Sequence, residues 1–78
     1  MALNFVQQRK LRIKQVAEYM REASKLAGGW VEIKTILLFC KVEIGIRERL
    51  ALEYVFAILE YYQSEFDYDK DKQSFRLK

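Results

Sequence analysis

Histidine and proline are absent from this chain of 78 residues, which contains only one cysteine, one tryptophan and three glycines. One cysteine cannot form an intrachain disulfide, and without histidine the common zinc-finger ligand sets are missing. A cysteine hydrolase is excluded as well, because Cys40 has no histidine to act as its base. We therefore expect Cys40 to be a small core residue.

Sequence signals for membrane insertion, secretion and catalysis are also missing. No apolar run is long enough to span a bilayer, and no secretory hydrophobic segment is recognisable. There is no phosphate-binding glycine loop and no cluster of metal ligands. Asp67, Asp69 and Asp71 alternate, but they lack the glycine and distal glutamate of a calcium loop, which indicates a solvated hairpin tip. The sequence predicts a soluble, cytoplasmic protein that is not an enzyme and uses no metal or cofactor.

Apolar residues are plentiful. They make up 51% of the chain and include five tyrosines and five phenylalanines. We expect residues 1–78 to form a single domain, near the lower size limit for a self-sufficient core. So small a domain does not bury all of this apolar surface, so we expect a second copy or a protein partner to cover the rest. The abundance of Lys, Glu, Ile and Tyr is typical of thermophile proteins.

Charge is distributed unevenly along the chain. The formal net charge is +3, with +4 on residues 1–31, +1 on residues 32–49 and −2 on residues 50–78. A weakly basic total with its positive charge near the N-terminus is compatible with nucleic-acid binding.

A long helix is predicted over residues 5–27. Asn4 followed three residues later by Gln7 is a variant of the capping box, and Gly28-Gly29 ends the helix because glycine accepts the left-handed conformation. Apolar side chains at helical spacing are expected to face the core: Val6, Ile13, Val16, Ala17, Met20, Ala23 and Ala27. The helix is long for so small a domain, so its first two turns should project beyond the core.

Shorter elements are predicted downstream. Residues 30–33 are β-branched and alternating, which is typical of a small strand that pairs with a later hairpin. Helices are predicted over residues 34–43 and 47–62, within a helix-turn-helix of about residues 33–62. The first of these two helices should bury Ile33, Ile36, Leu37 and Cys40. Residues 64–78 predict a β-hairpin whose shared face holds Phe66, Tyr68, Phe75 and Leu77.

The turn between the two short helices contains Gly45. Two helices joined by a short glycine-containing turn make a helix-turn-helix, whose second helix can enter a DNA major groove. Residues 45–54 read Gly-Ile-Arg-Glu-Arg-Leu-Ala-Leu-Glu-Tyr. With this phrase and the hairpin, the segment 32–77 resembles the small winged-helix proteins of thermophilic archaea, their plasmids and their viruses. The resemblance implies an α+β winged helix, with three helices and a C-terminal hairpin wing, that binds DNA or protein.

The helix predicted over residues 47–62 departs from the usual base-reading pattern. Arg47 replaces the customary Ser or Thr cap, and Leu52 stands where a basic residue is common. At about 100° per residue, the only polar arc of this helix holds Arg49, Glu53, Phe56 and Glu60. Its apolar residues form three stripes, more than we expect one small core to bury. A base-reading face is normally richer in Arg, Lys, Asn and Gln.

Two functions remain open. In the first, a small transcriptional regulator binds double-stranded DNA, with Arg47 and Arg49 on bases or phosphates. The other basic residues expected at phosphates are Lys34, Lys41, Arg9, Lys10, Arg12 and Lys14. In the second, the chain is an accessory subunit of a replication, polymerase or other multi-protein assembly. Its expected anchors are Leu52, Phe56 and Leu59. A homodimer is compatible with either function.

Overall fold

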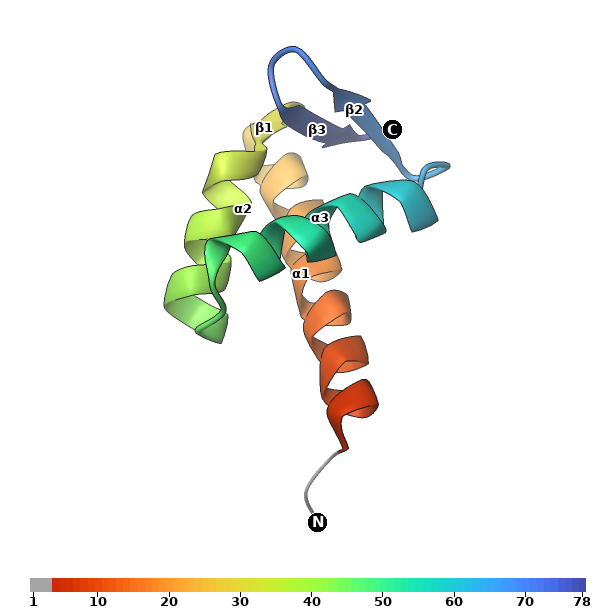
Figure 1. The fold of residues 1–78 in the computed structure, drawn as a ribbon. Coiled ribbons are helices and arrows are strands. Elements are labelled where there is room, and N and C mark those ends of the chain that lie inside the picture. Colours follow the sequence, from red (N-terminus) through yellow and green to blue (C-terminus); the bar gives the residue numbers. More distant parts are fainter. Residues whose placement is uncertain (1–3) are drawn as a thin grey trace.

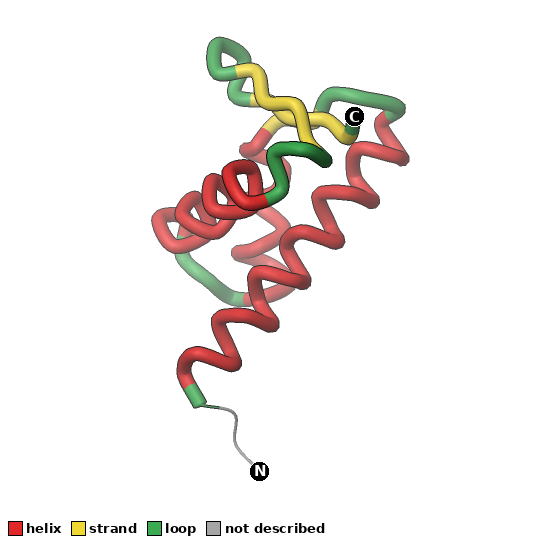
Figure 2. The backbone as a smooth tube through the Cα atoms, turned by 90° about the vertical axis from the view of Figure 1, so that its right-hand side faces the viewer, coloured by secondary structure: helices red, strands yellow, loops and turns green. Residues whose placement is uncertain are grey.

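Three α-helices and one antiparallel sheet form an α+β fold over residues 4–78, the part of the chain that the computed structural model describes (Figure 1). The elements in chain order are α1 (Phe5–Ala27), β1 (Val31–Glu32), α2 (Ile33–Phe39), the π-helical turn η1 (Cys40–Ile44), α3 (Glu48–Tyr61), β2 (Phe66–Asp69) and β3 (Ser74–Leu77). The sheet lies at the C-terminal end of α1, and α3 crosses α1 near its middle (Figures 1 and 2).

The predicted bounds of α1 are confirmed, and local signals account for them. The Asn4 side chain accepts a hydrogen bond from the Gln7 backbone N–H at 2.9 Å, and the Asn4 N–H donates to Gln7 Oε1 at 3.3 Å. At the other end, Gly28 adopts the left-handed conformation, with φ of 72°. Val6 is 60% exposed and Ala27 is also exposed, so their predicted burial is wrong. The N-terminal turns of α1, which include Val6, project beyond the core as expected, and Ala27 is the last residue of the helix (Figure 1).

The short first strand and the hairpin are also confirmed. The sheet has the order β1-β3-β2, with Val31 opposite Phe75 in β3. Phe66 pairs with Leu77, and Tyr68 pairs with Phe75, so these four side chains share one face. Phe66 and Phe75 are buried and meet edge to face, with ring centroids 5.8 Å apart. This face closes one end of the core.

The turn between α2 and α3 is built around Gly45. The backbone N–H groups of Gly45 and Ile46 both donate to the Cys40 carbonyl, at 2.8 and 3.2 Å. Gly45 has a φ of 78°, a conformation that a residue with a side chain rarely adopts. The helical stretch predicted over residues 34–43 therefore runs from Ile33 to Ile44, with its last turn widened into η1. Arg47 occupies the N-cap position of α3 without a side-chain capping bond.

The core buries more of α3 than the helical projection indicated. α3 packs against α1, α2 and β2, which together cover much of its apolar surface. Its buried residues are Ala51, Tyr54, Val55, Ile58 and Leu59. Leu59 is only 8% exposed, so it belongs to the core and offers little surface for the protein interface expected of it. Leu52 is partly buried against the same core, and Phe56 alone of the three expected anchors is clearly exposed.

Candidate nucleic-acid interface

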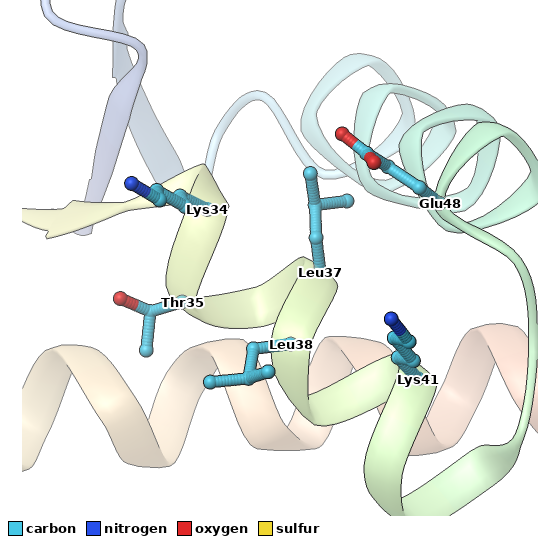
Figure 3. A pocket seen from close by; sticks show the side chains of 6 residues that line it. All are labelled: Lys34, Thr35, Leu37, Leu38, Lys41 and Glu48. Atoms are coloured by element: carbon cyan, nitrogen blue, oxygen red, sulfur yellow. The ribbon is translucent and has the colours of Figure 1, made fainter.

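Three predicted basic residues lie along α2, η1 and the turn that leads to α3. Lys34 is the second residue of α2, Lys41 lies in η1 and Arg47 precedes α3, and all three are exposed. Lys34 and Lys41 line a hollow of about 420 Å³, and Glu48 at the start of α3 lines it as well (Figure 3). Lys41 and Arg47 line the neighbouring hollow beside Gly45. We call Lys34, Lys41 and Arg47 the cationic edge.

Lys34, Lys41 and Arg47 form no ion pair with any other described residue. Within residues 4–78, the ion pairs join Arg21 to Glu65 and join Arg76 and Lys78 to Asp67. The Glu48 carboxylate shares the hollow with Lys34 and Lys41 and reduces its local charge (Figure 3). The N-terminus of α3 adds a partial positive charge beside Arg47. This edge can therefore attract an anion such as a phosphate.

The outward face of α3 has the mixed character that the sequence predicts. Arg49, Glu53, Phe56 and Glu60 are all exposed. Arg49 is the one basic residue of this face and lies in the first turn, while the two glutamates lie farther along the helix. Carboxylates repel phosphates, so only the start of α3 suits a close approach to a nucleic-acid backbone.

The four basic residues of the first turns of α1 do not form one group. Arg9 and Arg12 line a hollow with Leu50 and Tyr54, next to the start of α3. The Arg9 guanidinium lies 5.9 Å from the centroid of the Tyr54 ring, which directs it toward α3. Arg9 and Arg12 therefore flank the same end of α3 as Arg47 and Arg49.

Lys10 and Lys14 face elsewhere. They line a groove with the C-terminal half of α3, where Ala57, Tyr61 and Tyr62 are their neighbours. Sequence reasoning did not identify this groove, although two lysines spaced four residues apart and two adjacent tyrosines were available as signals. Its position depends on where α3 crosses α1, which no local pattern determines.

Acidic residues gather on a different side of the molecule. Glu18 and Glu22 of α1 line a hollow with Glu43 of η1, and the stacked rings of Tyr19 and Phe39 line it as well. Three carboxylates thus lie together between α1 and η1, whereas Glu48 is the carboxylate among the basic side chains at the start of α3.

Two further sequence predictions concern side chains outside the interface. Cys40 is fully buried, as expected, and burial raises the pKa of its thiol. At the hairpin tip, Asp69 Oδ1 accepts hydrogen bonds from the backbone N–H groups of Asp71 and Lys72, at 3.0 and 3.2 Å. The carboxylate of Asp69 therefore forms the turn, in line with its interpretation as part of a hairpin tip.

The order of helix, strand, helix-turn-helix and hairpin is compatible with a winged-helix arrangement. None of the helices described over residues 4–78 has the length and apolar character required to cross a membrane. No protein-family model, curated protein or solved structure matches this chain, so its function has to be inferred from its own residues.

Proposed function

We propose that the chain is a winged-helix DNA-binding protein that carries out no catalysis and acts as a small transcriptional regulator. The observation that supports this most is the collection of basic side chains around the start of α3. The cationic edge lies on its α2 side, Arg49 lies on its outward face, and Arg9 and Arg12 lie on its α1 side. None of them is in an ion pair within residues 4–78.

In this proposal, the N-terminal end of α3 enters the major groove of a DNA duplex, as in helix-turn-helix proteins generally. Arg47 and Arg49 lie nearest the base edges, where arginine can donate two hydrogen bonds to guanine. Lys34 and Lys41 contact phosphates of one strand, and Arg9 and Arg12 contact phosphates on the other side of α3. Glu53 and Glu60 keep the rest of the helix away from the duplex, because phosphates repel them.

The salt dependence of binding tests the proposal. Fluorescence anisotropy of a labelled duplex, titrated at several salt concentrations, should show binding that weakens as salt rises. Each lost phosphate contact reduces the magnitude of the negative slope of log K against log salt by about 0.9, so Lys34→Ala/Lys41→Ala should reduce it by about 1.8.

The matched control is Lys70→Ala/Lys72→Ala at the exposed hairpin tip, which removes the same charge and should leave the slope unchanged. Absence of binding at low salt contradicts DNA binding. If both double variants reduce the magnitude of the salt slope equally, the role of the cationic edge is contradicted and the effect is one of net charge.

A second candidate function, that of an accessory subunit in a larger assembly, is favoured by Phe56. This side chain is 44% exposed and meets the partly exposed Tyr68 edge to face, with ring centroids 5.9 Å apart. With Leu59 buried, a docking ridge on α3 would consist of Phe56 and the accessible part of Leu52. In that function, Phe56→Glu abolishes assembly with the partner and leaves the circular dichroism spectrum unchanged. Undiminished assembly of this variant contradicts it.

A further inference from the structure

A groove between α1 and the C-terminal half of α3 lies outside the proposed DNA-binding surface. Its volume is about 450 Å³. Its lining combines an apolar floor and two tyrosines with two basic side chains: Lys10, Ile13, Lys14, Ala57, Ile58, Tyr61 and Tyr62. No carboxylate lines it, and neither lysine is in an ion pair of the described residues. We call it the α1/α3 groove.

Tyr61 and Tyr62 line the α1/α3 groove, and contacts outside the groove fix their positions. The Arg21 guanidinium lies 5.2 Å from the centroid of the Tyr62 ring. Arg21 is itself fixed by Glu65, with its Nε 2.6 Å from Glu65 Oε1. Tyr61 then packs edge to face on Tyr62, at 4.8 Å between centroids, yet remains 81% exposed. A large aromatic surface is thus supported on one side and uncovered on the other, as at a docking site.

The adjacent face of α3 carries charges opposite in sign to those of the α1/α3 groove. Phe56 is flanked by Glu53 three residues before it and Glu60 four residues after it, so all three share one face of the helix. Both carboxylates are exposed and belong to no ion pair of residues 4–78. We call Glu53, Phe56 and Glu60 the acidic ridge. It offers an aromatic side chain between two negative charges, whereas the α1/α3 groove offers an apolar floor beside two positive charges.

We propose that the α1/α3 groove binds the acidic ridge of a second copy of this chain. The two surfaces are neighbours on α3, because Phe56 and Ala57 are adjacent and about 100° apart around the helix. A two-fold axis can therefore bring each ridge onto the groove of the other copy in one self-complementary interface. Phe56 of each copy enters the groove of the other, and its two glutamates face Lys10 and Lys14. Ala57 is small enough for the two α3 helices to approach closely.

This dimer does not rest on the proposed DNA binding and is measured separately from it, although the acidic ridge shares the outward face of α3 with Arg49. The cationic edge lies on the α2 side of α3, whereas the α1/α3 groove lies on its α1 side. The paired surfaces use the middle and end of α3 and leave Arg47 and the first turn outside the interface. Dimerisation can therefore be measured without DNA, and failure of one proposal leaves the other standing.

Charge exchange between the two surfaces tests the dimer. Multi-angle light scattering at tens of micromolar should give about twice the chain mass of 9.4 kDa for the unaltered protein. Lys10→Glu/Lys14→Glu and Glu53→Lys/Glu60→Lys each place like charges across both halves of the interface. Each of these variants should be monomeric with an unchanged circular dichroism spectrum.

An equimolar mixture of these two variants should restore the dimer mass. In the mixed pair, one half of the interface is as in the unaltered protein and the other half has both of its charges exchanged. Lys70→Glu/Lys72→Glu, with the same change of net charge at the hairpin tip, is the matched control. It should remain dimeric by itself and should not form a mixed dimer with Glu53→Lys/Glu60→Lys. A monomeric unaltered protein, two dimeric variants, or a mixture without recovery overturns the proposal.

Discussion

The Ser24 hydroxyl accepts a hydrogen bond from the Leu77 backbone N–H at 2.9 Å, joining residues 53 positions apart. The same hydroxyl donates to the Gly29 carbonyl at 2.8 Å. Ser24 is only 3% exposed, so water does not replace these partners. One side chain near the end of α1 thus fastens the last strand of the hairpin and the turn that leads to β1. The hairpin is held to the helices by this polar contact as well as by the buried faces of Phe66 and Phe75.

Replacing this hydroxyl should destabilise the protein. Ser24→Ala leaves the Leu77 N–H without its acceptor, and an unsatisfied buried donor costs about 1–3 kcal/mol. Urea unfolding, followed by circular dichroism, measures the difference. Ser64→Ala, at an exposed position after α3, is the matched control and should change the stability by less than about 0.5 kcal/mol. Equal stabilities of the two variants would show that the Ser24 contact contributes nothing.

The ends of α1 were predicted from the sequence, whereas the contacts of Ser24 within the same helix were not. The bounds of α1 depend on side chains within a few residues of each end, such as Asn4, Gln7 and Gly28, and they were predicted. The role of Ser24 depends on Leu77, and sequence spacing does not show that a serine on the helix meets a strand so far along the chain. Local signals therefore predicted the elements, but not the contacts that join them.

The candidate interface was likewise predicted only in part. The exposure of Arg47 and Arg49 and the mixed outward face of α3 follow from helical periodicity and were predicted. The separation of Arg9 from Lys10 was not predicted, because it depends on the line along which α3 crosses α1. The burial of Leu59 was missed for a related reason. Periodicity describes one helix, whereas α3 has neighbours on three sides.

The burial of Leu59 in the core can be tested by measuring the stability of a truncation variant. Leu59→Ala removes a side chain from the core and should cost about 2–5 kcal/mol, the range for truncating a buried leucine. Leu52→Ala should cost less, since Leu52 is only partly buried. Thermal or urea unfolding of both variants gives the comparison. If Leu59→Ala were as stable as the unaltered protein, Leu59 would belong to an exposed surface after all.

The ion pair between Arg21 and Glu65 predicts how stability depends on pH. The hydrogen bond from Arg21, followed by its charge, lowers the pKa of Glu65 in the folded protein. In the unfolded chain a glutamate has a pKa of about 4.3. The stabilisation is therefore fully present above that pH and is lost as the pH falls through the lower pKa of the folded state.

A neutral substitute should show this loss directly. Glu65→Gln should be less stable than the unaltered protein at pH 7, and the difference should shrink as the pH falls below about 4. Unfolding by urea at a series of pH values measures it. Glu32→Gln, at an exposed position outside the ion pairs of residues 4–78, is the control. A difference for Glu65→Gln that stays constant down to pH 2.5 would mean that the charge of Glu65 contributes nothing.

Arg49 separates base reading from general attraction to DNA. It is the one basic side chain on the outward face of α3, and it lies in the turn that enters the major groove in the proposed complex. On a duplex selected from random sequences for tight binding, Arg49→Ala should cost about 1–3 kcal/mol if Arg49 contacts a base. Arg49→Lys keeps the charge but cannot donate two hydrogen bonds to guanine in the same plane.

The lysine variant therefore decides the role of Arg49. Base reading predicts that Arg49→Lys also loses affinity for the selected duplex while keeping its affinity for unrelated DNA. A phosphate contact predicts that Arg49→Lys binds both like the unaltered protein, and that Arg49→Ala weakens both with a smaller salt slope. Undiminished binding of Arg49→Ala to the selected duplex would remove Arg49 from the interface. The cationic edge and the arginines of α1 would then have to account for DNA binding through phosphate contacts, without a base-reading residue on the outward face of α3.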